Sequence, residues 1–190
     1  MMSHSVVLFD ACILYPASLR DVLMYLAGSG LFQAKWTDRI HDEWISNLLE
    51  NQSEISRERL ERTRRKMNDS VLDSLVAGYE PLIDTVQLPD PNDRHVLAAA
   101  IYAGAGSIIT NNIRDFPAGV LATYGIEAIT PDEFLVRLID ENSGAVLATI
   151  KRQREHLKNP PRTVDEHLET LEKQGLSKTI AFLREHKTEM

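Results

Sequence analysis

The chain has 190 residues, of which 43% are hydrophobic and 26% are charged. This balance is typical of a folded domain with one sizeable core and a small appendage, while the net charge of -7 excludes nucleic-acid binding by overall charge alone. The single cysteine, Cys12, excludes an internal disulfide framework, and the short apolar run near the N-terminus argues against secretion and membrane spanning. We therefore expect a cytoplasmic protein.

Segments with strand patterns and segments with helix patterns alternate in the first part of the chain. Strands are expected at 5–10, 32–36, 82–88, 107–110 and 127–130, and helices at 18–30, 38–51, 55–78, 92–104 and 131–140. This alternation predicts an α/β domain over residues 1–140, with a mostly parallel sheet covered by helices on both faces. In such sheets, ligand sites lie at the carboxyl ends of the strands.

From about Ser143 onward the sequence has the pattern of helices only. Pro160 and Pro161 in KNPPRT end one helix, and Thr163 can cap the next. Apolar residues recur at helical spacing on both sides of this break. We therefore expect residues 141–190 to form a helical C-terminal extension that packs on the core or on a second subunit.

Acidic residues fall at the end of a predicted strand or at the start of a helix in three places. They are Asp10, Asp90 with Asp93, and Asp115. If the sheet is parallel, these places share one edge and the acids can converge. The helix at 38–51 offers a fourth acid, and periodicity does not decide among Asp38, Asp42 and Glu43.

Several carboxylates brought together repel one another unless divalent cations offset the repulsion. Oxygen ligands select hard ions, which predicts Mg²⁺ or Mn²⁺, and such sites serve phosphodiester hydrolysis. Each acid also has a local explanation: Asp90 as a helix cap before Pro91, Asp93 at a helix start, and Asp115 or Asp10 in a turn. These alternatives stay open. His41, His95 and Cys12 are interpreted as ordinary structural residues.

Two basic segments stand out in this acidic chain, at 57–66 and 151–162. The first carries Arg57, Arg62, Arg64 and Arg65, which could hold the flanking phosphates of a polyanion that the acidic site would otherwise repel. The alternative is that these arginines pair with Glu58, Glu61 and other surface acids, or contact a partner protein or a second subunit.

The ordered set LFDACIL, HDEWI, DPNDRHVLAAA and TNNIRDF resembles the PIN-domain nucleases, and within them the VapC-like toxins of bacterial toxin-antitoxin pairs. The resemblance spans about residues 5–140, and the tail resembles the C-terminal extension of one VapC-like subgroup. It implies a Rossmann-like α/β/α sandwich, Mg²⁺ or Mn²⁺ dependence and cleavage of single-stranded RNA. With RNA as the substrate, Arg57, Arg62, Arg64 and Arg65 are predicted to hold its phosphates beside the acidic groove. The resemblance also implies a homodimer and a cognate antitoxin that enters the acidic groove.

Carried over by position, the family's acidic quartet falls on Asp10, Glu43, Asp93 and Asp115, with Asp10, Asp93 and Asp115 as metal ligands. The supporting positions are Asp90, Thr110, Asn111 and Asn112. At Asn112 relatives often carry an aspartate, which puts a second metal in doubt. Two other functions compete with this one. A phosphotransfer domain would need another residue at Cys12, whereas a catalytically silent RNA- or protein-binding module of the same fold stays the alternative.

Overall fold

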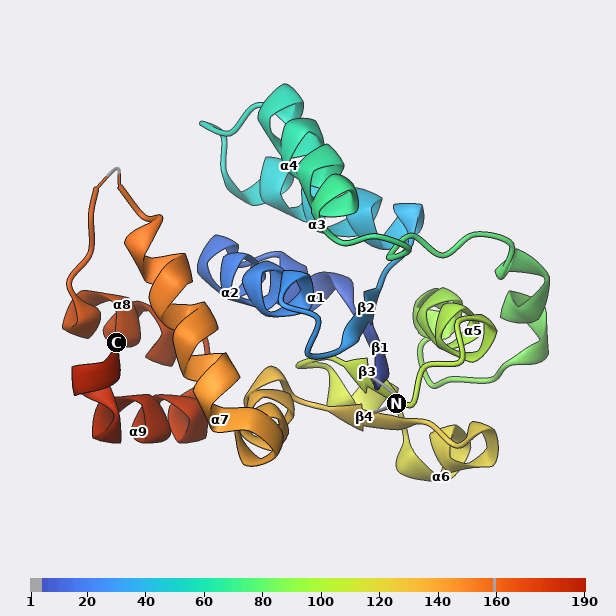
Figure 1. The fold of residues 1–190 in the computed structure, drawn as a ribbon. Helices are drawn as coiled ribbons and strands as arrows, with labels where there is room; N and C mark the ends of the chain where they lie inside the picture. The colour runs from blue at the N-terminus through green and yellow to red at the C-terminus, as the bar shows by residue number, and fades with distance from the viewer. Residues whose placement is uncertain (1–4, 159) are drawn as a thin grey trace.

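A computed structural model describes residues 5–158 and 160–190 (Figure 1). Residues 1–4, at the start of the N-terminal segment considered for secretion, and Asn159 in KNPPRT lie outside these ranges. The sheet consists of β1 (Val6–Phe9), β2 (Gln33–Lys35), β3 (Ser107–Ile109) and β4 (Glu127–Ile129). All pairs are parallel and the order is β2-β1-β3-β4. The predicted parallel α/β sheet is therefore confirmed.

Helices cover both faces of this sheet, with α5 on one side and α2 and α7 on the other (Figure 1). The α-helices are α1 (Ala11–Leu14), α2 (Ala17–Gly28), α3 (Asp38–Asn51), α4 (Arg57–Ser70), α5 (Arg94–Tyr102), α6 (Ala118–Leu121), α7 (Pro131–Glu155), α8 (Val164–Glu172) and α9 (Ser177–Glu185). Short 3₁₀ turns are η1 (Glu80–Thr85), η2 (Pro91–Asp93), η3 (Ile113–Asp115), η4 (Ala122–Tyr124) and η5 (Lys187–Glu189). None of the helices in the described ranges is long and apolar enough to cross a membrane.

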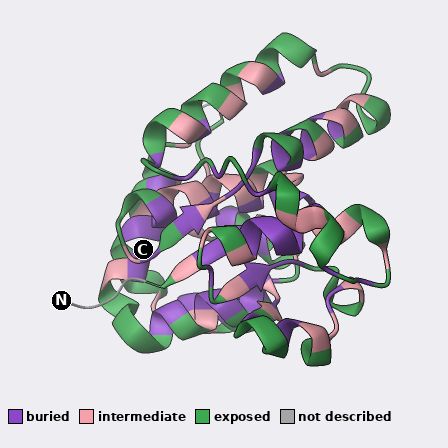
Figure 2. Cartoon of the chain, turned by 90° about the vertical axis from the view of Figure 1, so that its right-hand side faces the viewer, coloured by how far each residue is buried: buried purple, intermediate pink, exposed green. Residues whose placement is uncertain are grey.

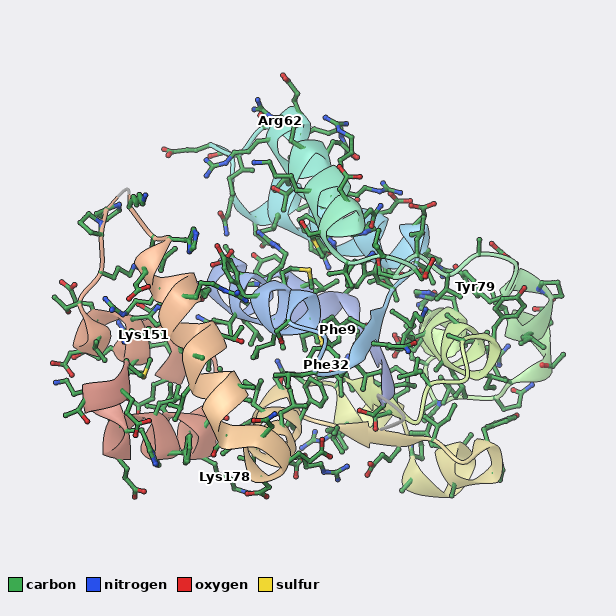
Figure 3. All side chains as sticks on the ribbon, viewed as in Figure 1. Phe9, Phe32, Arg62, Tyr79, Lys151 and Lys178 are labelled. Carbon is green, nitrogen blue, oxygen red and sulfur yellow. The ribbon has the colours of Figure 1, made fainter. Side chains whose placement is uncertain are left out.

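The core lies between the sheet and its helices. Figure 2 shows buried residues concentrated on the central strands and helices, with exposed residues on the outer faces. Phe9 and Phe32, side by side in Figure 3, have ring centroids 6.0 Å apart, and Phe134 of α7 packs edge-on against Phe32 at 4.8 Å. Such aromatic packing adds to the burial of apolar area, so the end of β1 packs on a rigid group of rings.

Side-chain caps fix where the helices begin. The hydroxyls of Thr37 and Ser56 accept hydrogen bonds from backbone N–H groups of α3 and α4. Thr130 with Glu133, and Thr163 with Glu166, form capping boxes at the starts of α7 and α8. The predicted cap at Thr163 is confirmed.

The strand expected at 82–88 is wrong. Pro81 stands at the start of the 3₁₀ turn η1, and Val86 to Leu88 continue as an extended segment outside the sheet. Val86 and Leu88 are buried and Gln87 is exposed, so the alternation that suggested a strand is present without a paired neighbour. The basic helix expected at 55–78 is shorter, because α4 ends at Ser70 and Val71 has extended backbone angles.

The predicted C-terminal extension is helical and packs on the core. Asp132, in the first turn of α7, accepts hydrogen bonds from the backbone N–H groups of Lys178 (3.0 Å) and Thr179 (2.9 Å), and from the Thr179 hydroxyl (2.7 Å). A single carboxylate thus caps the start of α9 from the core side. Helix α7 crosses the proposed 140/141 boundary and kinks at Asn142 (φ -157°, ψ 72°), so that boundary stays a prediction.

Candidate metal-dependent nuclease site

The candidate site begins where the two central strands end side by side. Asp10 follows β1 and Thr110 follows β3, and the Asp10 N–H donates to the Ile109 carbonyl at 3.1 Å. Because β1 and β3 are parallel neighbours, their carboxyl ends place Asp10 and Thr110 together, as predicted.

Asp10 is a buried carboxylate whose two oxygens have different partners. Its Oδ1 accepts from the Ala11 N–H at 2.7 Å, and its Oδ2 accepts from the Thr110 hydroxyl at 2.7 Å. Asp10 therefore caps α1, which is the local explanation that the sequence offered, and also belongs to a cluster. The local explanation is therefore confirmed for Oδ1, while a shared role of Asp10 with the other acids stays a prediction.

Cys12 packs partly buried against the hydrophobic core, as its interpretation as a small core residue expected, and it also contacts Asp10 and Thr110. Its thiol lies 3.2 Å from Asp10 Oδ2 and 3.3 Å from Thr110 Oγ1, and it accepts from the Asn111 N–H at 3.4 Å. Burial and the Asp10 charge raise the pKa of Cys12 to about 12. The thiol thus keeps its proton and helps to fix the Asp10 carboxylate. The position of Cys12, two residues after Asp10, was the feature of the sequence that could have indicated this contact.

Asp93 enters from the last position of η2, where α5 begins. Its Oδ2 is buried and has no hydrogen-bond partner among the described residues. Burial raises the pKa of Asp93 to about 6, with further contributions from the charges of Asp10, Asp90 and Asp115. Asp93 therefore lies in the field of three other acids. The packing of α5 against the sheet sets the position of Asp93. Within the described residues no strand directly precedes it, because the strand expected at 82–88 does not form.

The other predicted residues around Asp93 take distinct places. Asp90 caps η2 by accepting from the Asn92 N–H at 2.8 Å, as its local explanation foresaw. Asp115 ends η3 and is half-buried. Asn111 and Asn112 are exposed, and the Asn112 N–H donates to Thr110 Oγ1 at 2.9 Å. The turn after β3 thus orients Thr110 toward Asp10.

Glu43 has a partner that the sequence did not reveal. His95 Nε2 lies 2.7 Å from Glu43 Oε1, an ion-pair distance without the alignment of a hydrogen bond, and Arg39 approaches the same oxygen at 3.5 Å. His95 is 1% exposed, so its interpretation as a partly buried or surface residue is corrected. His95 follows Asp93 by two residues on α5, and it therefore connects Glu43 on α3 to the acid cluster. His41, also fully buried, lies 3.0 Å from the Asn68 Oδ1 instead.

The donor chemistry fits a hard divalent cation. Asp10, Asp93 and Asp115 offer oxygen ligands only, and the buried Asp93 Oδ2 has no hydrogen-bond partner within the described residues. Within residues 5–158 and 160–190, no three His, Cys, Asp or Glu side chains stand close enough to enclose an ion. The acids therefore share a field without forming a closed coordination shell.

The predicted RNA-binding arginines on α4 divide into two groups. Arg57, Arg62 and Arg65 are exposed, and Figure 3 shows Arg62 on the outer side of α4. Arg64 instead pairs with Asp38 at 2.5 Å and with Asp42 at 2.9 Å, which ties α4 to α3. For Arg64 the alternative of pairing with surface acids is therefore observed, while RNA contact by the other three stays a prediction.

Comparison with known families matches residues 6–114 to the PIN domain. The chain belongs to the PIN-domain family. The matched range contains Asp10, Glu43 and Asp93 and ends one residue before Asp115. Residues 131–185 match the VapC50 C-terminal domain, which begins with α7 and includes α8 and α9.

One curated relative matches part of the chain. The chain is 37% identical over 97 residues to the protein named "Putative ribonuclease VapC50" of Mycobacterium tuberculosis (strain ATCC 25618 / H37Rv). The alignment covers 51% of this chain and 57% of that relative, so it spans little more than half of the relative's length.

Proposed function

We propose that the protein is a Mg²⁺- or Mn²⁺-dependent endoribonuclease that cleaves single-stranded RNA, and that it acts as the toxin of a VapBC-type toxin-antitoxin pair. The observation that carries the chemistry is the buried, unpartnered Asp93 Oδ2 in the field of Asp10, Asp90 and Asp115. An acid cluster of this kind destabilises the empty site and favours a bound divalent cation.

Asp10, Asp93 and Asp115 would hold the cation, which when bound supplies an activated water and offsets charge on the phosphate. The chain's own residues prepare the site. Thr110 and Cys12 direct hydrogen bonds at Asp10 Oδ2, which fixes the orientation of that carboxylate. His95 holds Glu43 at the flank, where the Glu43 carboxylate can accept a proton from a water.

Cleavage of a labelled single-stranded RNA, measured with and without Mg²⁺, tests this function. We expect wild-type cleavage to require the metal and Asp10→Asn to abolish it, whereas Asp84→Asn, an exposed acid on η1, should cleave normally. Sequencing the RNA ends produced on induction in cells, with Asp10→Asn as the control, would identify the target. RNA binding without metal-dependent cleavage would instead support the alternative, a silent binding module.

An antitoxin partner and a homodimer are part of the same proposal and rest on the resemblance to VapC-like proteins. Light scattering coupled to size-exclusion chromatography tests the dimer. Addition of the candidate antitoxin should suppress cleavage in a stoichiometric manner. Cleavage that is unchanged at a molar excess of a bound candidate would contradict the toxin role of that pair.

A further inference from the structure

A second concave region lies away from the acid cluster, between α2, α4, α7 and the segment that precedes α8. It is a pocket of about 760 Å³. A volume in this range accommodates a nucleotide or another small ligand. The pocket exists only because the C-terminal extension packs beside the nuclease core, since α7 and the residues before α8 supply one of its walls.

The charged side chains that line the pocket are mostly cationic. They include Arg20, Lys66, Arg152 and Arg162, and of the described lining residues only Asp21 is acidic. Arg20 is held rigidly: it donates to the Leu14 carbonyl at 2.5 Å, and its guanidinium lies 4.6 Å from the centre of the Trp44 ring. This positive pocket contrasts with the net charge of -7 of the whole chain.

Two buried side chains in the pocket wall have polar atoms without hydrogen-bond partners among the described residues. His167 is 2% exposed, and neither ring nitrogen has a hydrogen-bond partner within the described residues. Gln153 is 1% exposed; its Nε2 donates to Asp21, while its Oε1 has no partner in the same ranges. Unpaired buried polar groups are costly, so their presence at a pocket wall indicates a ligand that completes their hydrogen bonds.

The pocket also has an aromatic and apolar side. The rings of Tyr25 and His156 lie 5.8 Å apart, with an interplanar angle of 50°, and both line the pocket. Met24 and Met67 add apolar surface. Aromatic rings beside arginines are the groups with which proteins bind bases and phosphates of single-stranded nucleic acid.

We propose that this pocket binds one nucleotide of the RNA strand, with a phosphate on Arg152 and Arg162 and the base against Tyr25. The inference rests on the proposed function and extends it, because it assigns the C-terminal extension a part in holding the substrate. Gln153 and His167 then meet the polar edges of the base or sugar. An acidic peptide would match the cations but not the aromatic side.

The pocket lies within reach of a strand bound at the acid cluster. Ala17 and Ser18 at the start of α2 line the pocket, and Ala17 is seven residues after Asp10. Seven residues span at most about 25 Å. The intervening chain includes the helix α1, which shortens that distance. A short single strand can therefore occupy both places at once.

The test measures binding in EDTA, where the acid cluster repels phosphate and cleavage is suppressed. Titrations of the full-length protein with 5′-AMP, with inorganic phosphate and with a single-stranded RNA 12-mer should show that AMP binds more tightly than phosphate. Arg152→Gln should weaken AMP and RNA binding by at least about fivefold, because a charge-assisted contact to phosphate is lost. Lys178→Gln, an exposed residue of α9 outside the pocket, is the control with the same charge change (Figure 3). Arg152 is exposed, so its replacement leaves the core intact.

Tyr25→Leu should weaken AMP binding without affecting phosphate, and Tyr124→Leu, an exposed tyrosine outside the pocket, should leave both unchanged. Equal affinity for AMP and phosphate, with no effect of Tyr25→Leu, would overturn the assignment in favour of a simple anion site. Weaker AMP binding with unaltered RNA binding in Arg152→Gln would reassign the pocket to a free nucleotide. Tighter binding of an octaglutamate peptide than of RNA would reassign it to a protein partner.

These readouts separate the two proposals. Loss of metal-dependent cleavage in the wild type, with intact Arg152-dependent RNA binding, would refute the nuclease function and leave the pocket assignment standing. Normal cleavage without AMP binding would refute the pocket assignment and leave the nuclease function standing.

Discussion

Replacement of Asp93 by asparagine removes one charge from the acid cluster and nearly preserves the shape of the side chain. In the folded protein the pKa of Asp93 is about 6, against 3.8 for the ordinary group. A difference of roughly two pKa units corresponds to about 3 kcal/mol at a pH well above 6. Asp93 is only half-buried, so water screens part of this repulsion, and the amide that replaces the carboxylate also stays partly buried. We therefore expect metal-free Asp93→Asn to be more stable than the wild type by about 1–2 kcal/mol at pH 7.5.

The sign follows from the direction of the shift. The folded pKa is raised, so ionisation of Asp93 favours the unfolded chain, and this penalty grows as the pH rises from 3.8 through 6. The advantage of Asp93→Asn should therefore be largest above pH 7 and should fall to a small fraction of that value at pH 4. Urea unfolding in EDTA at pH 4 and pH 7.5 measures both values, with Asp84→Asn as a control of equal charge change.

Addition of Mg²⁺ should reverse the order of stability of the wild type and Asp93→Asn. Mg²⁺ should stabilise the wild type by binding the folded state, and should leave Asp93→Asn nearly unchanged and inactive in RNA cleavage. A variant that is less stable than the wild type at pH 7.5 in EDTA, or one with the same advantage at both pH values, would refute the repulsion argument. Wild-type cleavage rates in the variant would refute the place of Asp93 in the site.

Three further outcomes are expected. Arg64→Gln should lower the free energy of unfolding by about 0.5–1 kcal/mol through its lost ion pairs, whereas Arg62→Gln should leave it unchanged. Arg62→Gln should instead lower the slope of the logarithm of RNA affinity against the logarithm of salt concentration by roughly 0.7. Asp132→Ala should destabilise α9 by about 1–3 kcal/mol, seen as faster hydrogen exchange from residue 177 to 185, while the sheet keeps its protection. Cys12 should resist iodoacetamide at pH 8 in the folded protein and react in urea, because the pKa of its thiol is about 12; rapid native labelling would contradict this.

The sequence was sufficient to predict the parts of the fold that depend on local pattern. Strands at 5–10 and 107–110 were recognisable as short apolar runs, and the end of each strand placed Asp10 and Thr110 at one sheet edge. Thr163 was recognisable as a cap because Pro160 and Pro161 mark a break before it. These features are determined by neighbours within a few residues.

Other features depend on contacts between distant elements and were not predictable from local pattern. The alternation at 82–88 has the period of a strand, but whether a strand forms depends on a neighbour to pair with, and that segment lies outside the sheet. The contact of His95 with Glu43 joins α5 to α3 across 52 residues. Likewise, the sequence does not distinguish Arg64 from its neighbouring arginines. Only the packing of α4 on α3 places it beside Asp38 and Asp42.

The kink in α7 has a mechanical consequence. Asn142 breaks the helical angles, and its Oδ1 accepts from the Ala145 N–H at 3.1 Å, so the second half of α7 carries its own N-terminal cap. From residue 142 to Gln153 this half forms a stiff arm of about 17 Å, and a change of about 10° at the joint would displace its tip by about 3 Å. The hydrogen bond from Gln153 to Asp21 of α2 anchors that tip. Buried Val146, Leu147 and Ile150 hold the arm along its length, and this bond holds its far end, so the arm is expected to move together with α2.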